Sequence, residues 1–197
     1  MKPDRSEIIK RVCERLDLGE LDAAESLISH EYPFEPVERF VRSYTPRQMT
    51  AVFMRDGFID RYRGDRLVYP PALRLVSQLL PKVFPYHKNG KMDVGHIAYW
   101  ELFPTIDHVV PIARGGLDEE PNWVCCSMLT NGIKSNWMLE DLRWELLQPG
   151  DLEQWDGMFL WFIGQMARSP KLSETPYLKT WYNAAKSVAD NRIHPTG

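Results

Sequence analysis

The sequence is poor in cysteine: it contains three, Cys13, Cys125 and Cys126, among 197 residues. Adjacent cysteines rarely bridge each other because the geometry is strained, and the absence of a CxxC pair excludes a four-cysteine zinc site. A low, odd number of cysteines is typical of a protein without a disulfide framework, in a reducing compartment. We expect Cys125 and Cys126 to lie in the core.

Long apolar stretches are also missing. No run approaches the roughly 18 apolar residues that a membrane-spanning helix needs. The N-terminal stretch MKPDRSEIIKRV has no apolar signal core either. We therefore expect no membrane span and a cytoplasmic location.

A basic excess is lacking overall, but the charge is unevenly distributed. The formal net charge is −3, whereas dedicated nucleic-acid-binding proteins are often strongly basic. Residues 1–36 carry a net charge of −4, and residues 37–74 carry +4 from eight arginines, no lysine and four acidic residues. Because the guanidinium fork fits phosphate well, the second stretch is either a phosphate-binding segment or a set of solvated surface arginines.

The remaining composition suits a folded domain with a real core, at 44% hydrophobic and 26% charged residues. Apolar residues at helical spacing predict two helices over 5–18 and 20–32, which form a hairpin. This hairpin would serve as packing support or as a cap that binds a partner. Thr45 and Pro46 predict the N-cap and the first residue of a third helix.

The rest of the chain mixes strand and helix signals. The pattern predicts a short hairpin at 58–70, a short helix and loop at 70–94, β-structure at 96–112, a strand running into a helix at 122–146, and a helical, aromatic-rich tail at 149–190. The expected class is α+β. We expect an N-terminal helical region at 1–44, a core at 45–147 with an insertion at about 65–95, and a C-terminal helical region at 148–197.

One stretch, TIDHVVPIARGG at 105–116, carries the chemistry. Hydrolysis of a phosphodiester needs a base for the attacking water, and His108 can serve at neutral pH. A divalent cation can stabilise the leaving oxygen, and Mg²⁺ needs only one or two protein oxygens, such as that of Asp107. Neighbours on a regular strand point to opposite faces, so a common site for both requires a bulge or a metal at the strand's edge.

Two asparagines follow at fixed distances: Asn122 stands 14 residues after His108, and Asn131 nine residues later. The segments DHVVPIARGG, PNW and TNGIK, with the upstream RDGFIDRYRG at 55–64, resemble the HNH endonuclease family, which has the ββα-metal fold. The resemblance covers about residues 53–145. It implies a ββα-metal (HNH) core embedded in a mainly helical domain, with the N-terminal helical hairpin and the C-terminal helices around it.

The resemblance also implies a role for each matching residue. His108 would be the general base, and Asp107 and Asn131 would ligate the metal. Asn122 would belong to the catalytic residues because it would fix the loop and orient the histidine through its backbone. Phosphate or DNA contacts would come from Arg114 and Lys134.

Two departures from the family pattern stand out. Where many relatives place four zinc cysteines, this chain has Asp60, Arg63, Ser127 and Thr130, so we expect no structural zinc. Our hypothesis is that these residues hold the two knuckles together by hydrogen bonds or a salt bridge. The second departure is length, because about 40 residues separate the hairpin near Gly64 from the Asp-His strand. This segment includes His96, which would be a second catalytic or phosphate-binding histidine, or else a structural one bonded to backbone.

The leading interpretation is a metal-dependent HNH endonuclease acting on DNA, double-stranded in the first instance, with Mg²⁺ or else Mn²⁺ or another divalent ion. The alternatives are a nucleic-acid- or protein-binding module without turnover and a helical protein with a fortuitous motif. The N-terminal helices or the Trp-rich tail would supply a homodimer contact or a protein-partner surface.

Overall fold

The computed structural model describes residues 4–34 and 43–193, with side chains to residue 190. The chain divides into two compact units, residues 1–42 and residues 43–197. The first boundary lies two residues from the one expected at residue 44. Arginines 39 and 42 of the predicted basic stretch lie outside the described residues.

The first unit is the predicted helical hairpin, α1 (Arg5–Asp17) and α2 (Leu21–Glu31). Asp4 caps α1 by accepting a hydrogen bond from the Ser6 amide, and Gly19 makes the turn with a φ of 74°. The two helices pack on each other, and an ion pair between Arg11 and Glu31 joins them.

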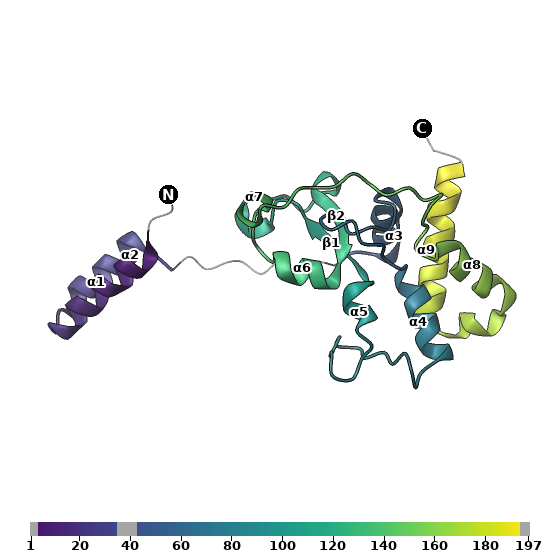
Figure 1. The fold of residues 1–197 in the computed structure, drawn as a ribbon, viewed down its shortest axis with the longest axis horizontal. Helices are drawn as coiled ribbons and strands as arrows, with labels where there is room; N and C mark the ends of the chain where they lie inside the picture. The colour runs from purple at the N-terminus through teal and green to yellow at the C-terminus, as the bar shows by residue number, and fades with distance from the viewer. Residues whose placement is uncertain (1–3, 35–42, 194–197) are drawn as a thin grey trace. The chain divides into compact units, whose positions relative to one another are not determined.

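The second unit has a helical core built around α9 (Pro176–Ile193), shown in yellow in Figure 1. Helices α3 (Pro46–Arg55), α4 (Pro70–Leu79) and α8 (Phe159–Arg168) pack against it. Thr45 caps α3, as the sequence predicts, and it does so in a capping box with Gln48 that we did not predict. Residues 148–197 share one buried cluster with residues 43–147 and do not form a separate unit. The cluster includes Phe53, Phe58, Tyr69, Phe162 and Leu178.

The sheet has two antiparallel strands, β1 (Pro104–His108) and β2 (Trp123–Ser127). Their register runs from Pro104 opposite Ser127 to His108 opposite Trp123, without a bulge. Helix α6 (Met128–Lys134) follows β2 directly, which confirms the predicted strand running into a helix. The described chain is mainly helical with a small antiparallel sheet, so the broad α+β class is confirmed. Cys125 and Cys126 are fully buried, as expected.

Several predicted elements differ in the structure. Residues 96–112 are not all β-structure, because the short helix α5 (Ala98–Glu101) precedes β1. The Tyr99 hydroxyl anchors that turn inside the protein by bonding Ser77 and the Leu73 carbonyl. The hairpin at 58–70 is reduced to one bridge between Ile59 and Arg66.

The helix expected to run on to residue 146 is also shorter. It ends at Lys134, where Ser135 has a φ of 47°, and a second short helix, α7 (Leu139–Leu142), follows. Three short 3₁₀ segments, η1 (Ile112–Arg114), η2 (Glu120–Asn122) and η3 (Pro170–Glu174), complete the described elements. In the part of the chain that the structure describes, no helix has both the length and the apolar character to cross a bilayer.

Candidate active site

Buried carboxylates satisfy the outer edge of β2. Asp56 Oδ2 accepts a 2.7 Å hydrogen bond from the Cys125 amide, and Asp60 Oδ2 accepts one of 3.0 Å from the Ser127 amide. The backbone of Arg61 donates to the Cys125 carbonyl. Both carboxylates are fully buried, and Asp56 is neutralised by Arg61 at 2.9 Å. An otherwise unpaired strand edge is thereby covered.

Three of the four residues at the zinc-cysteine positions take part in this arrangement. The Asp60 carboxylate accepts hydrogen bonds from the Tyr62 and Arg63 amides of its own turn and from the Ser127 amide, so it joins the two segments. The Ser127 hydroxyl bonds Thr130 at 2.9 Å. Arg63 differs from the hypothesis, because its side chain is exposed and pairs with Asp65 instead. Hydrogen bonds therefore connect the two knuckles, without a salt bridge from Arg63.

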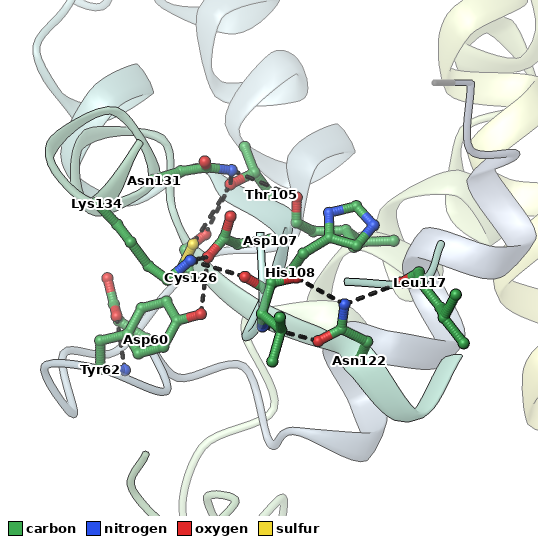
Figure 2. A network of polar contacts seen from close by, with 12 residues as sticks. Asp60, Tyr62, Thr105, Asp107, His108, Leu117, Asn122, Cys126, Asn131 and Lys134 are labelled. Atoms are coloured by element: carbon green, nitrogen blue, oxygen red, sulfur yellow. Dashed lines mark hydrogen bonds and ion pairs between the residues drawn. The ribbon is translucent and has the colours of Figure 1, made fainter. Parts of the chain in front are cut away.

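Helix α6 lies along the outer edge of β1 and contributes two polar side chains there. The Asn131 amide nitrogen donates to the Thr105 hydroxyl at 3.0 Å and to the Ile106 carbonyl at 3.3 Å. The Lys134 ammonium donates to the His108 carbonyl at 2.7 Å. Figure 2 shows both side chains reaching from the helix to the strand. The sequence positions that the HNH pattern links are thus neighbours in space.

Asp107 is buried between Tyr62 and Lys134. Its Oδ2 accepts a 2.7 Å hydrogen bond from the Tyr62 hydroxyl and lies 2.9 Å from the Lys134 ammonium. Burial, followed by the negative charge of Asp107, raises the pKa of Tyr62 far above its ordinary value, so the phenol remains a donor. Lys134 is fully buried beside Asp107 and is therefore not exposed for the phosphate contact that the HNH resemblance implies.

Asp107 and Asn131 each retain a free oxygen. Among the described residues, Oδ1 of Asp107 and Oδ1 of Asn131 have no hydrogen bond. Among the described residues, Nε of Arg74 is the one side-chain nitrogen or oxygen that is both sealed from solvent and without a hydrogen bond. Because the two unbonded oxygens of Asp107 and Asn131 are not in that class, they keep contact with solvent. The described residues contain no cluster of three or more His, Cys, Asp or Glu arranged for a metal. A cation held here would therefore need amide and water oxygens among its ligands.

His108 is held by a loop residue that the sequence did not single out. Its Nε2 lies 2.8 Å from Asp118 Oδ1 and 3.3 Å from the Tyr44 hydroxyl. The same Asp118 oxygen accepts hydrogen bonds from Tyr44 at 2.8 Å and Trp123 at 2.9 Å. Burial opposes the charge on Asp118, but these hydrogen bonds prevail and hold the pKa of its carboxyl below the usual value. His108 itself is 2% exposed.

Asn122 fixes the loop after β1. Its Oδ1 accepts a hydrogen bond from the Val110 amide, and its Nδ2 donates one to the Val110 carbonyl, both at 2.9 Å. Nδ2 also donates to the Leu117 carbonyl. The second glycine of the motif, Gly116, lies so close that an added Cβ would stand 1.8 Å from the Val110 carbonyl oxygen. The first, Gly115, has a φ of 88°. These contacts match the loop-fixing role expected of Asn122 and show why two glycines stand together.

Asp107 and His108 point to opposite faces of β1. Figure 2 shows the Asp107 carboxylate beside Lys134 and the His108 ring turned away from it. The strand is regular, so the bulge that we considered is absent from it. The remaining way to bring both to one phosphate is the strand's end, because His108 is the last residue of β1.

The two other expected phosphate contacts lie in different settings. Arg114 is exposed in η1, and its Nε donates to the Asn136 carbonyl at 3.3 Å. His96 stacks on Phe84, with ring centroids 4.3 Å apart, and its Nδ1 accepts a hydrogen bond from the Ala98 amide. These contacts support the turn into α5, and no contact among the described residues joins His96 to His108.

Sequence reasoning missed Asp118, Tyr44 and Tyr62. The loop GGLDEEPNW contains three consecutive acidic residues, and nothing in its spacing distinguishes Asp118 from Glu119 or Glu120. Tyr62 lies 45 residues before Asp107 and Tyr44 lies 64 residues before His108. Local periodicity carries no signal for such distant pairs.

Comparison with known proteins adds no relative. No protein-family model, curated protein or solved structure matches this chain. Its function therefore has to be inferred from the residues and geometry of the site itself.

Proposed function

We propose that this protein is a metal-dependent endonuclease of the HNH type that hydrolyses phosphodiester bonds in DNA. The observation that carries the proposal is the β1–β2–α6 unit, which gathers Asp107, His108, Asn122 and Asn131. These four residues stand at the spacing of the HNH pattern, and each occupies a position that suits its proposed role.

The donor set of Asp107 and Asn131 fits a hard divalent cation. One carboxylate oxygen and one amide oxygen are free among the described residues, and Mg²⁺ commonly retains several waters beside so few protein ligands. Their remaining polar atoms are already bonded, which fixes both side chains. When bound, the ion would stabilise negative charge on the leaving oxygen.

His108 is prepared to accept a proton through Nδ1. A carboxylate can only accept hydrogen bonds, so Nε2 facing Asp118 carries the ring's proton in the neutral tautomer. Nδ1 then bears the free lone pair. It has no hydrogen bond among the described residues, yet it is not sealed from solvent. Asp118 would thus orient the base and stabilise the imidazolium that forms when water is deprotonated.

The DNA backbone would lie across the C-terminal end of β1, where Asp107 and His108 are the last two residues of the strand. Arg114 is exposed in the loop that follows this end and would contact a neighbouring phosphate. Contacts of this kind hold the backbone without reading bases, so binding should weaken as salt rises.

One observation favours a second candidate, a nucleic-acid-binding module without turnover. The Lys134 ammonium already lies 2.9 Å from Asp107 and offsets the charge that would attract a cation. The two candidates differ in whether cleavage occurs, not in the surface that contacts DNA.

A plasmid assay distinguishes the two candidates. Supercoiled plasmid is incubated with wild-type protein, His108→Ala and His30→Ala, each with Mg²⁺, Mn²⁺ or EDTA. His30 is the matched control because it is exposed on α2 and bonds only its own helix among the described residues. Nicking by wild type and His30→Ala alone, and only with metal, is the expected result. No cleavage under any metal, or undiminished cleavage by His108→Ala, would overturn the proposal.

A further inference from the structure

A cavity lies beside the proposed catalytic unit. It has a volume of about 210 Å³ and is bordered by α4, α5, the start of α6, α9 and the loop between α4 and α5. Figure 1 shows that loop below α5. The side chains that matter to its chemistry are Arg74, Tyr86, Lys88, Tyr99, Met128 and Tyr177. No acidic residue lines the cavity.

Arg74 is held in this cavity by aromatic rings rather than by a carboxylate. Its guanidinium carbon lies 3.3 Å from the ring centroid of Tyr86 and 5.4 Å from that of Tyr177. Its Nε is sealed and has no hydrogen-bond partner in the described part of the chain. A ligand cannot reach that sealed atom, so it would bond the terminal nitrogens, Nη1 and Nη2, which are not among the sealed and unbonded atoms. Anionic oxygens are the acceptors that a guanidinium fork fits best.

The aromatic wall is rigid on one side and open on the other. Tyr99 is buried, and its hydroxyl is fixed by Ser77 and the Leu73 carbonyl. Tyr86 packs edge-on against it, with ring centroids 5.1 Å apart, yet remains 41% exposed. Arg74 and Lys88 have no ion pair with a carboxylate in the described part of the chain, and Tyr86 beside them is partly exposed. Cations and an aromatic ring are the two elements by which proteins bind single-stranded nucleic acid, through phosphate attraction and stacking.

We propose that this cavity, the Arg74 pocket, binds one unpaired nucleotide of a nucleic-acid chain. The base would stack on the face of Tyr86 that Arg74 leaves uncovered, and its phosphate would bond Arg74 with help from Lys88. The volume is below the ~300–1,000 Å³ of pockets that enclose a drug-sized ligand, so it suits a single ring with its phosphate at the mouth. The inference rests on the proposed nuclease function and specifies its substrate: DNA with an unpaired stretch next to the cut.

The position of the pocket relative to the metal ligands supports this assignment. Met128, which lines the pocket, is the first residue of α6, and Asn131 is three residues farther along the same helix. That separation is about 4.5 Å along the helix axis, and residues three apart lie on the same side. A strand that leaves the pocket therefore passes the proposed catalytic unit within a short length.

Binding in EDTA tests the pocket independently of cleavage. The probe is a fluorescein-labelled 12-nucleotide oligothymidylate, measured by anisotropy beside a duplex of equal length. We expect Arg74→Gln and Tyr86→Leu each to weaken binding of the single strand about tenfold and to change duplex binding little. Tyr86→Phe keeps the ring and should bind as wild type. The matched charge control is Arg168→Gln, because Arg168 is exposed at the end of α8, away from the pocket lining.

A second measurement does not depend on how the variants fold. An oligothymidylate carrying one 4-thiothymidine is irradiated with wild-type protein, and the crosslinked peptide is identified by mass spectrometry. A crosslink within residues 86–90 is expected. Excess thymidine monophosphate as competitor shows whether the pocket binds a chain or only a free nucleotide.

The outcomes separate this inference from the proposed function. Equal single-strand binding by wild type and both pocket variants, or crosslinks confined to other segments, would overturn the Arg74 pocket even if plasmid is cleaved. Displacement of the oligonucleotide by stoichiometric thymidine monophosphate would also overturn it as a chain-binding site. Arg74-dependent binding without any plasmid cleavage would support the pocket while the nuclease proposal fails.

Discussion

Oδ1 of Asp118 lies 2.8 Å from Nε2 of His108 and also accepts hydrogen bonds from Tyr44 and Trp123. Three donors on one carboxylate oxygen fix the position of a residue that belongs to an otherwise exposed loop. The arrangement couples the proposed base to the loop that precedes β2. In the proposed mechanism Asp118 is a positioning residue, whose effect on catalysis would pass through the histidine.

Replacing Asp118 tests this coupling. Asp118→Asn keeps the size but offers Nε2 an amide whose orientation can favour the wrong tautomer, so we expect kcat to fall by about 10²- to 10⁴-fold, the range for one acid–base group. KM and thermal stability should change little, and Asp118→Glu should recover part of kcat. Glu119→Gln is the control, because it removes a neighbouring exposed charge. A loss seen only in KM would assign Asp118 to substrate binding instead.

Lys134 and Asp107 form a buried ion pair at 2.9 Å, and the ammonium also bonds the His108 carbonyl. Lys134→Met leaves the Asp107 charge and that carbonyl without this partner. Breaking a buried pair from one side typically costs about 3–5 kcal/mol, so the urea midpoint should fall sharply. Lys171→Met, on an exposed lysine of η3, should leave it unchanged.

A double variant separates the charge from the packing. Adding Asp107→Leu to Lys134→Met removes the uncompensated carboxylate, and we expect part of the lost stability to return while cleavage is abolished. If the stability losses of Lys134→Met and Asp107→Leu simply add in the double variant, the two residues are not energetically coupled, which would contradict the ion pair seen in the structure.

How much the sequence could predict depended on whether the signal was local. The capping residue Thr45 and the order of β2 and α6 follow from neighbouring residues, and both are confirmed. The spacing of His108, Asn122 and Asn131 indicated residues that do lie around one ββα unit. Their chemical roles stay predictions.

Long-range contacts explain what the sequence could not supply. The HNH resemblance implies a phosphate contact for Lys134, but the residue is buried, and its partners Asp107 and His108 come from a strand 26 residues earlier. Residues 96–103 have β-prone side chains, yet Tyr99 is drawn into a helical turn by bonds to α4. In both cases, tertiary partners rather than local preference decide the outcome.

The proposed metal ligands make a quantitative prediction. Asp107→Asn and Asn131→Ala each remove or weaken one oxygen ligand, so the Mg²⁺ concentration for half-maximal cleavage should rise more than tenfold. Removing a group that supports a metal ligand commonly costs 10–100-fold in metal affinity or activity, and a direct ligand should cost at least as much. Titration of cleavage rate against Mg²⁺, repeated with Mn²⁺, gives the shift. An unchanged midpoint in both variants would remove these residues from the metal site.

Gly116 allows a matched test of the loop that follows His108. A Cβ at this position would lie 1.8 Å from the Val110 carbonyl oxygen and 2.9 Å from Nδ2 of Asn122, whereas one at Gly132 would meet nothing within 4 Å. Gly116→Ala should therefore cost about 1–3 kcal/mol, the usual range for overpacking. Gly132→Ala, inside α6, should stabilise by about 0.5–1 kcal/mol through helix propensity.

Cleavage should follow the same division, because the Gly116 clash displaces the segment after His108 that Asn122 holds through Val110. We expect Gly116→Ala to lose activity even at temperatures where it remains folded by circular dichroism, while Gly132→Ala keeps the wild-type rate. The close approach of Gly116 would then be a requirement of the site as well as of the fold. Equal activity of the two variants in the folded range would show that the loop's position is not needed for cleavage.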